Sequence, residues 1–157
     1  MGDINNIKRI WTDKDFSVMG WHDNRFYGFS FDYLNHNLIL DIDYIFEWLT
    51  DIQNPGHYTG FIVAPCTLIF ESCSAIKINF DLKDTTDLVI NEIKRHTPRL
   101  TPNGKFNEYT YKIILDNGDV EFSSVGFIQK VRELPKIIKN QDLGYGNNRR
   151  EMFKSPL

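Results

Sequence analysis

Apolar and polar residues alternate almost without a break between Asn37 and Trp48. One set of alternate positions is apolar throughout, namely Leu38, Leu40, Ile42, Tyr44, Phe46 and Trp48. The other set contains the charged residues Asp41, Asp43 and Glu47, together with Ile39 and Ile45. Because successive side chains of a strand point to opposite faces of a sheet, this pattern predicts a long β-strand with one buried face and one exposed, acidic face.

Similar patterns elsewhere in the chain predict further strands. Alternating or continuously apolar segments cover residues 25–31, 61–70, 75–80, 109–115 and 120–134. Residues 84–95 fit either a short helix or a strand. Pro65 lies inside the most apolar of these segments. Since proline has no backbone N–H to donate, Pro65 predicts a bulge or a sheet edge at that point.

Two short connections predict hairpins and so an antiparallel arrangement. Residues 32–37 are rich in turn formers and join two predicted strands. Asn117-Gly118 supplies the two positive-φ residues of a two-residue type I′ turn. Together, the segments predict a mainly β protein, a single-domain antiparallel β-barrel or sandwich of six to eight strands with little helix.

Length and composition agree with one folded domain. The 157 residues are enough for one core and too few for two ordinary ones, so we expect a single domain over residues 1–157. From about residue 147 the chain becomes polar and charged, which predicts a flexible C-terminal tail. Aromatic residues make up 14% of the chain, far more than a disordered protein carries.

Charge and cysteine usage narrow the possible partners and the compartment. The formal net charge of −3 gives no electrostatic reason to expect nucleic acid as a partner. No signal peptide begins the sequence, and no apolar stretch reaches the roughly 18 residues of a membrane span. We therefore expect a cytoplasmic protein with no membrane partner, in which Cys66 and Cys73 remain free thiols.

The carboxylates of the alternating strand are the first candidate for chemistry. Asp41 and Asp43 stand two residues apart on one face, roughly 7 Å from each other, and His22-Asp23 precede the neighbouring strand. Such a cluster suits an acid/base pair or a shared cation. The simpler interpretation is that the two carboxylates face water or pair with a basic residue on a neighbouring strand: Arg25, Lys112 or Lys130.

Other candidates carry weaker signals. Glu71 with Gln129 and Arg132 is more typical of a structural ion pair than of catalysis. Cys66 lies in an apolar segment, where a thiol is usually unreactive. No spacing of ligating residues matches a recognised metal motif, so we predict neither a metal nor a cofactor. The catalytic residues of a conventional enzyme are not recognisable in this sequence.

Four segments of the chain resemble a family of small uncharacterised bacterial proteins. They read GWHDNRFYGFSFD, LILDIDYIFEW, VAPCTLIFE and GFIQKVRELP, and the resemblance spans most of the chain. It implies an antiparallel, β-rich fold and brings no activity, cofactor or catalytic residue. The compact size is also similar to that of immunity proteins encoded beside bacterial toxins.

Two hypotheses about function remain open at this point. In the first, the protein is a non-catalytic module, immunity-like or an adaptor, that docks another protein with an acidic and aromatic surface. In the second, it is a small-ligand or metal-binding barrel, and possibly an enzyme, with its site at Asp41, Asp43, His22 and Asp23. The lack of a catalytic signature favours the first. A pocket lined by those four side chains would favour the second, and a flat acidic face the first.

Overall fold

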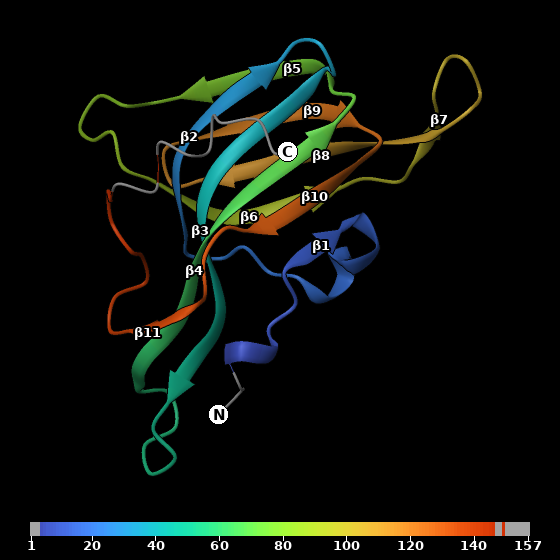
Figure 1. Cartoon of the computed structure of the whole chain (residues 1–157). Coiled ribbons are helices and arrows are strands. Elements are labelled where there is room, and N and C mark those ends of the chain that lie inside the picture. The colour runs from blue at the N-terminus through green and yellow to red at the C-terminus, as the bar shows by residue number, and fades with distance from the viewer. Residues whose placement is uncertain (1–3, 147–148, 150–157) are drawn as a thin grey trace.

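The protein is built on one antiparallel β-sheet. In the computed structural model, which describes residues 4–146 and 149, 57% of the described residues are strand and 7% are helix. The expectation of a mainly β, antiparallel protein is therefore confirmed. The sheet has 11 described strands in place of the expected six to eight, and it is one open sheet, running from β1 at one end to β5 at the other, in place of the expected barrel or sandwich. Figure 1 shows the strands wound into this single sheet.

The elements follow one another with little helix between them. The strands are β1 (Ile10–Thr12), β2 (Asn24–Asp32), β3 (Asn37–Thr50), β4 (Tyr58–Glu71), β5 (Ser74–Phe80), β6 (Leu88–Arg95), β7 (Arg99–Leu100), β8 (Asn107–Leu115), β9 (Gly118–Ser124), β10 (Gly126–Val131) and β11 (Lys136–Ile138). Two 3-10 helices, η1 (Ile4–Asn6) and η2 (Asp13–Val18), flank β1. Residues 88–95, which fit a helix or a strand by sequence, are the strand β6.

The order of strands in the sheet is β1-β10-β4-β3-β2-β6-β8-β9-β5. The short strands β11 and β7 pair outside this path, with β4 and β8. β3 and β4 are the longest strands and lie side by side near the middle of the sheet. The strand with the clearest alternation is thus paired on both edges, by β2 and by β4.

The sheet curls around one aromatic core. Phe70 on β4 contacts Tyr111 on β8 and Phe122 on β9, with ring centroids 5.0 and 4.6 Å apart. Since three strands separate β4 from β8 in the sheet, these contacts require the sheet to bend over itself. The even positions of β3 point into this core, namely Leu38, Leu40, Ile42 and Tyr44, as their alternation predicts.

The alternation of β3 does not continue unchanged to its end. Its pairing with β4 shifts register between Ile45 and Glu47, where one extra residue is accommodated. After this irregularity Trp48 packs with Ile45 on the opposite face of the sheet, in a small second cluster. The expectation that Trp48 shares a face with Leu38 is therefore wrong, because a bulge reverses the sides of all later residues.

Pro65 lies where the neighbouring strand is interrupted. It stands opposite Asp43 in β3, and its carbonyl accepts a hydrogen bond from the backbone N–H of Arg132 at 2.9 Å. On that side β10 ends at Val131 and β11 starts at Lys136. The N–H and C=O of one strand residue point to the same side of the strand. The N–H that proline lacks would therefore point toward the gap between β10 and β11, where no described strand needs it as a donor. Pro65 thus marks a local edge, one of the two predicted possibilities.

The segment predicted as one strand over residues 120–134 is two strands. It breaks at Val125, whose backbone N–H donates to Glu71 O at 3.2 Å. β9 pairs with β8 and β5, whereas β10 pairs with β4 and β1. The break therefore lets the chain cross from one end of the sheet to the other. The predicted tail from about residue 147 lies outside the described residues, apart from Arg149.

The hairpin predicted around residue 117 is confirmed, but not its turn type. Leu115 pairs with Gly118, so the two turn residues are Asp116 and Asn117, neither of which has a positive φ. Gly118 has a φ of +148°, and a Cβ there would lie 2.0 Å from the carbonyl oxygen of Asn79 on β5. Glycine is required at this position by the close approach of the edge strand.

We expect Gly118→Ala to lower the free energy of unfolding by about 2 kcal/mol or more, because the methyl group would force β5 away from β9. Urea denaturation of the purified protein measures this loss. Gly28→Ala is the matched control, since no atom lies within 4 Å of a Cβ built there, and it should change stability far less. Equal losses for the two variants would contradict this account of Gly118.

Candidate functional site

The two aspartates singled out by sequence are buried. Asp41 is 3% exposed and Asp43 is 0% exposed, so the prediction of an exposed acidic face is wrong. The chain after β10 returns over this face: Ile138 and Leu143 pack against Ile45 and its neighbours there. As far as Ile45, alternation along β3 separates its two faces correctly, but it does not reveal that later residues cover the second face.

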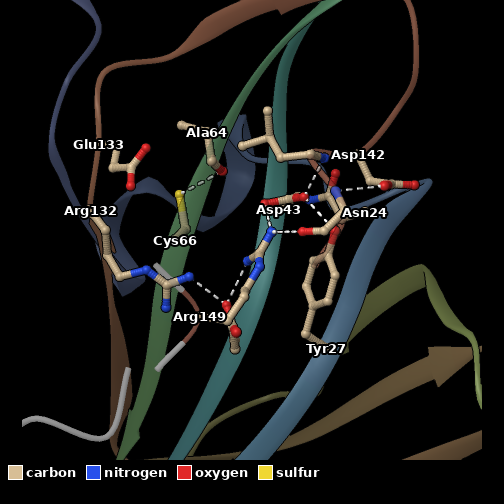
Figure 2. A network of polar contacts seen from close by, with 12 residues as sticks. Asn24, Tyr27, Asp43, Ala64, Cys66, Arg132, Glu133, Asp142 and Arg149 are labelled. Atoms are coloured by element: carbon tan, nitrogen blue, oxygen red, sulfur yellow. Dashed lines mark hydrogen bonds and ion pairs between the residues drawn. The ribbon is translucent and has the colours of Figure 1, made fainter. Parts of the chain in front are cut away.

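Two arginines bind the buried carboxylates. Arg132 Nη2 lies 2.5 Å from Asp41 Oδ1, and Arg149 Nη1 lies 2.8 Å from the same oxygen. The second terminal nitrogen of Arg149 forms an ion pair with Asp43 Oδ1. Figure 2 shows Arg149 lying over β3 and reaching toward Asp43, with Tyr27 on one side of it and Arg132 on the other. Arg149 thus bridges both carboxylates.

Asp43 has two further donors, which use its second oxygen. The hydroxyl of Tyr27, on β2, and the backbone N–H of Leu143 each donate to Asp43 Oδ2 at 2.7 Å. Tyr27 also contacts Arg149 through its ring, since the guanidinium carbon lies 3.5 Å from the ring centroid. Each of these contacts favours a charged carboxylate beside a charged guanidinium.

The surroundings shift the pKa values of Tyr27 and Arg149. Burial raises the pKa of Tyr27, and its hydrogen bond to the Asp43 carboxylate raises it further, so the phenol stays protonated. Burial alone would lower the pKa of Arg149, but the hydrogen bond and the charge of Asp43 outweigh it and raise that pKa. Tyr27 is therefore a hydrogen-bond donor and Arg149 a permanent cation.

The network is balanced in charge, because two carboxylates face two guanidinium groups. Asp41 and Asp43 therefore accept hydrogen bonds from arginine side chains. This arrangement differs from that of a catalytic acid/base pair. Among the residues that the structure describes, no group of three or more His, Cys, Asp or Glu side chains could hold a metal ion. The chemistry that this arrangement supports is recognition of a guanidinium group.

His22 and Asp23 do not join the two buried aspartates. They contact each other, with His22 Nδ1 3.0 Å from Asp23 Oδ2, and Gln141 Nε2 donates to the same carboxylate at 3.1 Å. A surface hollow of about 400 Å³ lies nearby, lined partly by Trp21, His22 and Ile93. Of the four residues predicted as a site, His22 alone lines it, so this hollow and the buried carboxylates are separate features.

Sequence reasoning missed most partners of the aspartates. We expected Arg25, Lys112 or Lys130 on a neighbouring strand as the basic partner; the partners are instead Arg132 and Arg149, and neither lies on a strand. Arg132 was grouped with Glu71, yet it binds Asp41 and the hydroxyl of Thr67. Arg149 lies 108 residues from Asp41 along the chain, and no local pattern marks it.

The two cysteines are free, as predicted. Cys66 is fully buried, and burial raises the pKa of its thiol well above the usual value. Burial also raises the pKa of Cys73, to about 11. Since the thiolate is the nucleophile, neither thiol is activated for catalysis.

No family model, curated protein or solved structure matches the chain in the comparisons made. The resemblance to small bacterial proteins therefore stays a prediction. In the part of the chain that the structure describes, none of the helices has the length and apolar character needed to cross a membrane.

We expect Asp43→Ala to lower the free energy of unfolding by on the order of 3–5 kcal/mol, because Arg149 and Tyr27 would lose a buried acceptor together. Chemical denaturation measures the loss. Asp119→Ala is the matched control: Asp119 is partly exposed and lies 3.9 Å from Lys112, so its removal should cost roughly 0.5 kcal/mol or less. A small loss at Asp43 would show that the network adds little to stability.

In the native protein both thiols should react very slowly with an alkylating reagent at pH 8. With a pKa of about 11, only about one thousandth of Cys73 is thiolate at that pH, and Cys66 is shielded by burial. Mass spectrometry after timed alkylation, with and without urea, measures this. Rapid labelling of folded Cys66 would contradict its placement in the core.

Proposed function

We propose that this protein is a non-catalytic module that binds another protein, as an immunity-like partner or an adaptor. One observation carries the proposal, the exposed apolar turn between β2 and β3. Phe31 is 50% exposed, Tyr33 is 78% exposed and Leu34 is 77% exposed. Single exposed apolar residues are common, but three large ones within four positions form a patch of the kind found at protein interfaces.

The turn is held in one conformation before any partner arrives. Asp32 Oδ1 accepts hydrogen bonds from the backbone N–H groups of Leu34 and Asn35 at 3.2 and 3.3 Å. The turn is also tied to the connection between β4 and β5, because the backbone N–H of Cys73 donates to His36 O at 2.6 Å. An ordered turn loses little conformational freedom on binding, which favours affinity.

Phe31, at the end of β2 next to the turn, is connected to the core by contacts between aromatic rings. Phe31 contacts Phe29 with ring centroids 5.6 Å apart, and Phe29 contacts Phe80 on β5 at 6.2 Å. Tyr33 and Leu34 therefore directly follow a strand end that is packed against the core. The partner we propose is a protein with an apolar depression that receives these two side chains, since aromatic anchors in pockets dominate interface energetics.

The alternative function, a small-ligand or metal-binding protein with a His/Asp site, has less support. Asp41 and Asp43 are already bound by arginines, and His22 and Asp23 contact neither of them in the contacts described above. The raised pKa of Cys66 also argues against a thiol nucleophile. We therefore favour binding over catalysis.

We expect a double variant, Tyr33→Ser with Leu34→Ser, to lose its partner while keeping its fold. Immobilised wild-type protein, incubated with native lysate, should retain a protein that the double variant does not, as identified by mass spectrometry. Ile52→Ser is the matched control: Ile52 is 96% exposed at the opposite end of β3, and its replacement should leave capture unchanged. Equal capture by the double variant would contradict the proposal.

A further inference from the structure

Arg149 is held in the manner of a bound ligand. It lies beyond β11, the last strand that the structure describes, which ends at Ile138. Its carboxylate partners are 108 and 106 residues away along the chain. The side chain lies over the face of the sheet (Figure 2), and the described strands β2, β3 and β4 pair with one another without it.

Arg132 shows the contrast. Its own backbone N–H donates to Pro65 O at 2.9 Å, and its side chain also reaches Thr67 Oγ1 at 3.2 Å. Arg132 directly follows β10, so its position is fixed by the pairing of β10 with β4. Arg149 lies outside the strands that the structure describes: its backbone N–H donates to Gly146 O at 3.3 Å, and its departure would leave every described strand pair intact.

The groups that receive Arg149 come from two adjacent central strands. Asp41 and Asp43 lie on β3, and Tyr27 lies on β2. The carboxylates meet the terminal nitrogens of the guanidinium, and the aromatic ring covers its face at 3.5 Å. This combination recognises a flat, charged fork and suits a guanidinium far better than an ammonium group.

Charge requires that this position be filled by a cation. Without Arg149, Arg132 would still pair with Asp41, but the buried carboxylate of Asp43 would lose the guanidinium that pairs with it. A hollow of about 100 Å³ lies beside Arg149, lined in part by Pro65, Glu133 and Gly146. Replacement of Arg149 by another guanidinium preserves the charge balance.

We propose that Tyr27, Asp41 and Asp43 form a guanidinium-binding site, which Arg149 fills within the chain and which an arginine side chain of a partner protein can take over. The identity of the ligand as a partner's arginine rests on the proposed binding function; the site itself does not. Arg149 then acts as an internal competitor. Because it is tethered, its effective concentration is on the order of millimolar, so a free ligand competes poorly with it.

The test removes the internal competitor and supplies a replacement. Arg149→Ala should melt at a lower temperature than the wild type, and ethylguanidinium at millimolar concentration should restore much of the difference. Isothermal titration should detect ethylguanidinium binding to Arg149→Ala and at least tenfold weaker binding to the wild type. N-acetylarginine amide should bind Arg149→Ala as well, and N-acetyllysine amide more weakly.

Three controls separate a specific site from a general effect. Ethylammonium carries the same charge without the planar fork, so it should restore less stability. The double variant Arg149→Ala with Asp43→Asn should not respond to ethylguanidinium. Arg99→Ala removes an exposed arginine paired with Glu108, and ethylguanidinium should not stabilise that variant.

Several outcomes would overturn the proposal. A folded Arg149→Ala protein that shows neither binding nor a rise in melting temperature would mean that Arg149 is a purely structural residue. If Arg149→Ala does not fold alone, refolding with ethylguanidinium but not with ethylammonium supports the site, and failure with both overturns it. None of these results depends on the β2–β3 turn, so they are distinguishable from a loss of partner capture by the Tyr33 and Leu34 variant.

Discussion

The buried carboxylates of β3 impose the constraint on which the outer face of the sheet depends. A carboxylate withdrawn from water costs several kcal/mol unless cationic or hydrogen-bonding groups surround it. Asp43 is fully buried and receives donors from β2, from Leu143 and from Arg149. Those donors lie at widely separated positions in the chain, so the segment after β10 must fold back onto β3 to supply them.

This arrangement gives the two faces of the sheet different characters. The inner face encloses the large aromatic core around Phe70 and Tyr111. The outer face has a small apolar cluster around Ile45, together with the ionic network. A second sheet is therefore not needed to cover the outer face, since one returning segment with few apolar residues and two arginines covers the middle of β3.

The same arrangement links stability to recognition. Arg149 balances the buried charge, and it also occupies the position that a foreign guanidinium would take. The exposed turn at Tyr33 and Leu34 lies at the end of β3 that carries Leu38, away from the β3–β4 loop. The binding module we propose would therefore present a rigid apolar turn at one end of its long strands and a cation site against their middle.

The sequence alone determined the local features. The two-residue periodicity located the long strands and assigned Ile42 to the core, because the faces of a strand are set by its own backbone. Glycine and proline marked Gly118 and Pro65 as special positions, since their constraints are also local. The hairpin around Asn117 was also located, although its turn residues are Asp116-Asn117 and not Asn117-Gly118, and its turn type differs from the expected one.

Only the tertiary structure decided whether the second face of β3 meets water or protein. The burial of Asp41 and Asp43 depends on Arg149, more than 100 residues later in the chain, and no pattern within β3 encodes it. The number of strands and the open form of the sheet likewise depend on pairing between distant segments, such as β10 with β4. Periodicity specifies which side chains share a face, whereas the long-range return of the chain specifies what that face contacts.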